Sequence, residues 1–200
     1  MGNGLIAGFP RAKELFEEVR VGDIRTQGFD LNGGWVPLYN MHKLIVGLAD
    51  TYHYTNNEKA LDVLIKLSDY FVTLFGGLTD EQIQTILVSE HGGINEAFVY
   101  VYSLTNDKKF LDLSLRLNHK VVLDPLAEKV DDLCGKHANT QIPKVIGCIQ
   151  QYNYIKDEKL YQIADFFWNT VVHSHSYVIG GNSEAEHFGV PNRTYDRITD

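Results

Sequence analysis

The feature that most constrains the fold of this chain is an internal repeat with a period of fifty residues. Three segments align without gaps, beginning at Tyr52, Tyr102 and Tyr152, and each carries a lysine seven residues after its tyrosine. A short polar insert (N-N-E-K, N-D-K-K or K-D-E-K) ends each segment and is typical of a turn followed by an Asn or Asp helix cap. Self-similarity at this period predicts repeated supersecondary units.

Amphipathic helices are expected on both sides of each turn. Apolar residues recur at helical spacing before each turn and also after two of the turns, from Leu61 to Phe71 and from Leu160 to Val171. A strand pattern is confined to the short S-Y-V-I at 176–179. The sequence therefore predicts an all-α fold of helical hairpins, three complete and a fourth begun. The stripes before the turns are Met41, Leu44, Ile45, Leu48 and Tyr52; Ile94, Ala97, Phe98, Val101 and Tyr102; and Ile142, Val145, Ile146, Ile149 and Tyr152.

Stacked hairpins can form an open solenoid or close into a ring. The length of the pairs and their richness in aromatic residues favour part of an (α/α)6 toroid, in which the first helix of every hairpin lines the inner wall. An open scaffold of the TPR or HEAT type stays as the alternative, because periodicity alone does not distinguish the two.

The composition of the chain limits the classes of function that it can have. With 44% apolar and 22% charged residues in 200, the chain is expected to form one globular domain. A formal charge of −8 disfavours a nucleic-acid partner, and the absence of an 18-residue apolar run disfavours a membrane span. The N-terminal M-G-N-G-L-I-A-G-F-P lacks the features of a signal peptide. Cys134 and Cys148 form no C-x-x-C pair, and Cys148 is expected in the core. Oligomeric state has no signature in the sequence.

Four polar residues recur at the start of successive first helices. His42, His91, His137 and Glu186 follow one another at intervals of 49, 46 and 49 residues. In a ring of hairpins these positions lie at one end of the inner wall and face its centre. Burying such groups without partners would cost about 1–3 kcal/mol each, so a shared polar pocket is expected. Imidazoles can donate to or accept from hydroxyl groups, which suits a sugar.

The loop G-G-N-S-E-A-E-H-F-G at 180–189 holds the carboxylates. Its glycines allow a tight backbone that presents Glu186 as a general acid/base, supported by Glu184 and His187. A partly closed apolar pocket would raise the pKa of Glu186 toward the useful range. A polar loop without chemistry is one alternative. A zinc or iron site built from the three histidines and Glu186 is another, disfavoured because ring positions lie too far apart and no H-E-x-x-H is present.

Four ordered blocks carry a family resemblance: N-G-G-W-V-P-L-Y-N-M-H-K, S-E-H-G-G-I-N-E, H-A-N-T-Q-I-P-K-V-I-G and G-G-N-S-E-A-E-H-F. Together they resemble the catalytic domain of glycoside hydrolase family 127 (β-L-arabinofuranosidase, DUF1680), over nearly the whole chain. The resemblance implies an (α/α)6 barrel and a retaining glycosidase acting on a carbohydrate. It implies Glu186 as acid/base, with the following residues at the sugar: Tyr39, His42, His91, His137, Asn139, Gln141 and His187.

The resemblance also implies a zinc-bound cysteine thiolate as nucleophile. Its E-x-C motif and later Cys pair are expected beyond Asp200, so residues 1–200 are expected to form about half of the ring, to bind no metal and to lack turnover alone. The family is often secreted or periplasmic. A sugar epimerase or unsaturated-uronyl hydrolase on the same toroid stays as an alternative, as does a non-catalytic helical-repeat scaffold.

Overall fold

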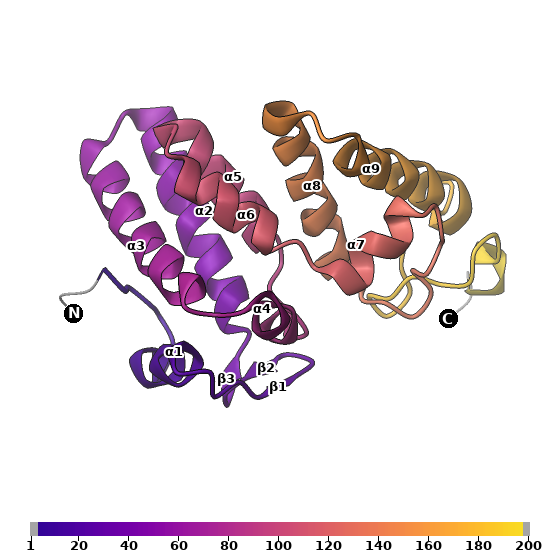
Figure 1. Ribbon diagram of the computed structural model, residues 1–200. Coiled ribbons are helices and arrows are strands. Elements are labelled where there is room, and N and C mark those ends of the chain that lie inside the picture. Colours follow the sequence, from indigo (N-terminus) through magenta and orange to yellow (C-terminus); the bar gives the residue numbers. More distant parts are fainter. Residues whose placement is uncertain (1–3, 198–200) are drawn as a thin grey trace. The chain divides into compact units, whose positions relative to one another are not determined.

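The computed structural model describes residues 4–197 and is mostly helical (Figure 1). The chain forms two compact units, the first ending at Asn118 and the second beginning at His119. The helical fold expected from the repeat is confirmed. Within the described residues, no helix is long and apolar enough to cross a membrane.

The first unit contains two of the expected hairpins, α2–α3 and α5–α6. A small antiparallel sheet in the order β1-β2-β3, together with α1 and α4, lies at the end of the unit where α2 begins (Figure 1). The elements are α1 (Ala12–Arg20), β1 (Thr26–Gln27), β2 (Asp30–Leu31), β3 (Gly34–Trp35), α2 (Pro37–Thr55), α3 (Glu58–Gly76), α4 (Asp80–Ile86), α5 (Ile94–Thr105) and α6 (Lys108–Arg116).

The second unit contains the third hairpin, α8–α9. The short helix α7 packs against α9, and a π-helical turn extends α9. The elements are α7 (Lys120–Ala127), α8 (Ala138–Ile155), α9 (Glu158–Thr170), the π-helical turn Val171–His175 and the 3-10 turn Thr194–Arg197.

The three hairpin turns repeat one backbone geometry. The residue after each first helix is left-handed, with φ of 52° at Asn56, 55° at Asn106 and 54° at Lys156. The next residue caps the second helix: the side chains of Asn57, Asp107 and Asp157 each accept a hydrogen bond from a backbone N–H of the first turn. The fifty-residue repeat and its predicted caps are therefore confirmed.

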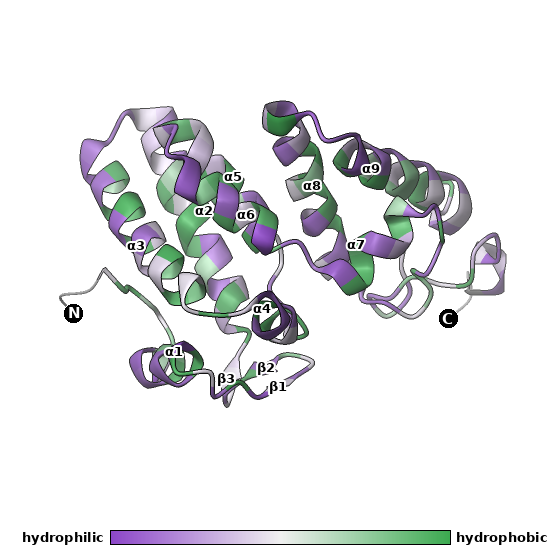
Figure 2. Cartoon of the chain, viewed as in Figure 1, coloured by the Kyte–Doolittle hydropathy of each residue, from purple (hydrophilic) through white to green (hydrophobic). Residues whose placement is uncertain are grey.

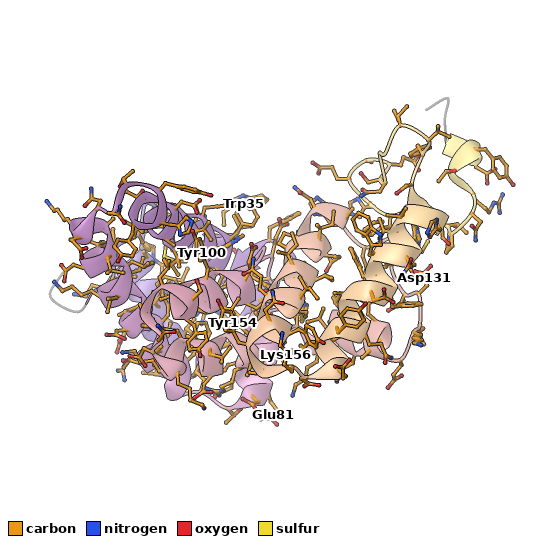
Figure 3. All side chains as sticks on the ribbon, turned by 90° about the horizontal axis from the view of Figure 1, so that it is seen from above. Trp35, Glu81, Tyr100, Asp131, Tyr154 and Lys156 are labelled. Carbon is orange, nitrogen blue, oxygen red and sulfur yellow. The ribbon has the colours of Figure 1, made fainter. Side chains whose placement is uncertain are left out.

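Lys156 occupies a left-handed position where the other two copies have asparagine, which tolerates that conformation better. We expect Lys156→Gly to raise the free energy of unfolding by about 0.5–1 kcal/mol, because glycine adopts positive φ without steric cost. Urea denaturation measures the change. Asn106→Gly is the control and should change stability less; an equal gain in both variants would contradict the explanation. Figure 3 labels Lys156.

Aromatic side chains form the centre of the first unit. The ring of Phe71 in α3 is fully buried and meets Phe16 of α1 at 5.2 Å and Phe98 of α5 at 6.3 Å between ring centroids. Phe75, one turn after Phe71, lies 6.2 Å from it. Figure 2 shows stripes of apolar residues along these helices. This core joins α1 to both hairpins and fixes α2, which carries His42, and α5, which follows the loop that contains His91.

The prediction of a strand at 176–179 is wrong. Tyr177 donates its N–H to the carbonyl of Gly181, closing a tight turn, and the side chains of Val178 and Ile179 at its tip are exposed. Apolar residues here do not alternate between a core and solvent. The strands of the described chain lie instead within 26–35, and each is only two residues long, too short to show a period.

Helix α8 differs from the other first helices in the face that it buries. Ile146, expected in the core, is 40% exposed. The buried face carries Gln141, Lys144, Cys148 and Gln151 instead. Cys148 is a core residue, as expected, and burial raises the pKa of its thiol to about 12. Polar side chains therefore form part of the buried face of α8.

Candidate functional site

The first unit brings together His42 from the second turn of α2 and the loop that precedes α5. The N–H of Gly93 donates to Nδ1 of His42 at 3.2 Å, which leaves Nε2 as the protonated nitrogen. Nε2 lies 3.8 Å from a carboxylate oxygen of Glu96 in α5. Tyr39 packs edge-on against the His42 ring at 6.1 Å. His42 is therefore held as a neutral imidazole with a defined tautomer.

His91 lies in the same loop and is also buried. Its Nδ1–H donates to the carbonyl of Ser89 at 2.9 Å, so Nε2 carries the lone pair. The neighbouring Gly92 has a φ of +56°, and a Cβ there would lie 2.8 Å from Nδ1 of His42 and 2.9 Å from the ring of Tyr39. The loop can approach α2 this closely only because residue 92 is glycine.

Burial, reinforced by the charge of Lys43, lowers the pKa of His42 from 6.5 to about 4. The unfolded chain then binds more protons than the folded one between these values, so the free energy of unfolding should fall as the pH drops from 6.5 toward 4, by roughly 1 kcal/mol per pH unit. Urea denaturation at pH 7, 5.5 and 4.5 measures the slope. His42→Gln should reduce the slope by about this amount; an unchanged slope would show that His42 does not contribute.

The second unit presents Glu186 on a two-residue turn. Glu184 and His187 exchange both backbone hydrogen bonds, at 2.8 and 2.9 Å, and the two residues between them are left-handed, with φ of 43° at Ala185 and 68° at Glu186. Turns of this kind usually use Asn or Gly at such positions. Holding two side-chain-bearing residues in this conformation costs free energy, and such strain concentrates at functional sites.

Hydrogen bonds tie this turn to the start of α8. The carbonyl of Glu186 accepts from the N–H of Ala138 at 2.8 Å, which satisfies an otherwise orphan donor of the first helical turn. Phe188 pairs with Lys136 and Gly135 through its N–H and carbonyl, and its buried ring anchors the loop. The position of Glu186 is thus fixed relative to His137, the residue before α8.

The side chains of this second group meet directly. Nε2 of His137 lies 3.2 Å from Oε2 of Glu186. The ring of His187 stands edge-on to that of His137, with 5.3 Å between centroids, and its Nδ1–H donates to the carbonyl of Ala185. The side chain of Glu186 is 75% exposed, so the partly closed apolar pocket expected around it is not built by the neighbouring residues of its own unit.

Two other predicted site residues lie on the first turn of α8. Asn139 is exposed, whereas Gln141 is buried and its amide is engaged: Nε2 donates to the carbonyl of His137 and to Thr140, and Oε1 accepts from Lys144. Lys144 also contacts Nδ1 of His119. Burial, and after it the charge of Lys144, lowers the pKa of His119 to about 3. Gln141 is placed to hold the backbone at His137.

The predicted residues thus form one group in each unit. Tyr39, His42 and His91 belong to the first, and His137, Asn139, Gln141, Glu186 and His187 to the second. That both groups face one hollow stays a prediction from the sequence. Glu96, Lys144 and His119 were not expected. Glu96 and Lys144 lie in S-E-H-G-G-I-N-E and H-A-N-T-Q-I-P-K, two of the blocks that carry the family resemblance, and this was the available signal.

The described residues do not fit a zinc centre. Among residues 4–197 no group of three or more His, Cys, Asp or Glu side chains is placed to hold a metal ion. Cys134 is exposed and Cys148 is buried, apart from any such group. The zinc and thiolate chemistry implied by the resemblance stays an expectation, and no step below depends on it.

Comparison with known proteins decides the family. The model of the β-L-arabinofuranosidase GH127 catalytic domain matches residues 1–200. The chain belongs to this GH127 family. No curated protein matches the sequence. As a GH127 domain the protein is of the glycoside hydrolase class, and its substrate class is carbohydrate. The four blocks that suggested the family contain both groups of side chains described above.

Proposed function

We propose that this GH127 domain serves in an enzyme that removes terminal β-L-arabinofuranosyl residues from plant-type glycans with retention of configuration, and that Glu186 is its general acid/base. The observation that carries the proposal is the strained turn that presents Glu186 beside His137. An exposed carboxyl group at 3.2 Å from an imidazole is accessible to substrate and is oriented by its neighbour.

In this proposal Glu186 donates its proton to the glycosidic oxygen as the bond to the leaving group breaks, and later takes a proton from the water that releases the sugar. The neutral His42, with Nε2–H as donor, and His91, with Nε2 as acceptor, bind hydroxyl groups of the sugar. His137 orients the carboxyl group of Glu186. Within their own units, Tyr39 packs against the ring of His42 and His187 against that of His137.

Calorimetry with methyl β-L-arabinofuranoside tests sugar recognition by the chain. We expect His137→Ala and His42→Ala each to weaken binding by about 2- to 10-fold, since a lost hydrogen bond to a sugar is worth about 0.5–1.5 kcal/mol. Tyr54→Ala, at an exposed position on the last turn of α2, is the control and should bind as the wild type does. Unchanged affinity in both histidine variants would leave the helical scaffold as the better explanation.

A further inference from the structure

The hairpin before α2 carries an exposed aromatic pair, Phe29 and Trp35. Their ring centroids are 5.1 Å apart and the ring planes are tilted by 35°. Trp35 is 70% exposed and Phe29 41%. Figure 3 shows the labelled Trp35 side chain at the edge of its unit. Each ring supports the other, and together they leave an aromatic face open to solvent.

The backbone next to this pair is strained. Val36, directly after Trp35, is left-handed with φ of 40° and ψ of 52°, a genuine outlier for a β-branched residue. It is held there by its N–H, which donates to the carbonyl of Phe29 at 2.7 Å, and by Asn40, whose side chain donates to the carbonyl of Val36 at 3.0 Å. Pro37 then starts α2 at once, so the indole of Trp35 is fixed relative to that helix.

The aromatic pair borders the first group of site residues. Gly28, next to Phe29, accepts a hydrogen bond from the N–H of Glu90 at 2.9 Å, and Glu90 precedes His91. On the other side Tyr39, one helical turn after Trp35, contacts the ring of His42. The platform is therefore attached to both loops that position the histidines, and all these residues belong to the first unit.

We propose that Trp35 and Phe29 form a stacking platform for a second sugar residue of the glycan, the one next to the arabinofuranose bound by the histidines. This inference rests on the proposed function. Flat aromatic faces bind the C–H face of a sugar ring, and two rings match the area of one sugar rather than that of a protein partner. The polar side chains near the pair are the half-buried Asp30 and the exposed Asn40, and they suit the hydroxyl groups of this sugar.

The chain offers a direct optical test, because Trp35 and Trp168 are its two tryptophans. In Trp168→Phe the emission reports Trp35 alone. Titration with a β-L-arabinofuranosyl disaccharide should shift or quench this emission, whereas methyl β-L-arabinofuranoside should leave it nearly unchanged. In the reverse variant, Trp35→Phe, the emission of Trp168 should stay constant with either sugar. If calorimetry detects binding of the disaccharide but the emission of Trp35 does not change, the proposal is overturned.

Affinities provide the second measurement. Trp35→Ala should weaken disaccharide binding about 3- to 10-fold, as expected for one aromatic contact, without changing the affinity for the methyl glycoside. Trp35→Phe should restore part of the loss, and Trp168→Ala, at an equally exposed indole, should cause none. Equal losses for both sugars overturn the separate platform but leave the proposed function standing. A wild-type chain that binds neither sugar overturns both.

Discussion

Replacing Glu186 with glutamine should lower kcat/KM of the active enzyme for an alkyl β-L-arabinofuranoside by about 10²–10⁴-fold, the usual contribution of a general acid. An alkoxide leaves poorly without a proton, so this substrate depends on the acid. An aryl glycoside with an acidic phenol needs little protonation, and its bond cleavage should be slowed much less. Initial rates on the two substrates, measured side by side, give the ratio that identifies a proton donor.

Glu184 provides the matched control, because it lies two residues away on the same turn. Glu184→Gln removes one carboxylate and keeps the shape of the side chain, and it should reduce the rate far less than Glu186→Gln. A larger loss in Glu184→Gln, selective for the alkyl glycoside, would assign the proton to Glu184 instead. Equal losses on both substrates in Glu186→Gln would remove Glu186 from the acid role.

Replacing Phe71 with alanine should lower the free energy of unfolding by about 3–5 kcal/mol, the range for a buried phenylalanine. Its ring is fully buried and contacts Phe16 and Phe98. Its removal would therefore leave a cavity where α1 packs against both hairpins of the first unit. The effect should appear in the urea midpoint and in the near-ultraviolet circular dichroism of the aromatic core.

Tyr54→Ala is the control for this prediction, since Tyr54 is 77% exposed and its loss should change stability by less than about 0.5 kcal/mol. Phe71→Leu should recover part of the loss by refilling the space. A loss below about 1 kcal/mol in Phe71→Ala would mean that the surrounding helices collapse into the cavity and that the aromatic cluster is not the main core of the unit.

The helical hairpins could be predicted because their signal is local and repeated. A turn of two polar residues, the second of which caps the next helix, recurs three times, and each copy supports the interpretation of the others. The two-residue strands could not be predicted, because a strand so short shows no alternation. The third stripe was partly wrong at Ile146, since helical period alone does not say which face of α8 is covered and Gln141 and Lys144 are buried instead.

For the site, spacing and the family motifs identified residues but not their local geometry. The sequence placed His137 and Glu186 at one pocket and assigned Glu184 and His187 as the supports of Glu186. The contact of 3.2 Å between Nε2 of His137 and Oε2 of Glu186 was not part of that prediction. The left-handed turn at Ala185 and Glu186 was not predictable, because neither residue type favours positive φ. Tertiary hydrogen bonds, above all from Ala138 to Glu186, impose it. Glu96 was overlooked because its role depends on a contact between two helices.

The left-handed turns that join each hairpin lie at the far end of their helices from the histidines. In α2, thirteen residues separate His42 from the end of the helix at Thr55, about 20 Å at 1.5 Å per residue. Peptide tags or fluorescent reporters inserted between Asn56 and Asn57 would thus be remote from His42. Protein engineers could attach this unit to a surface or a sensor through that point and leave the end that carries the histidines unobstructed.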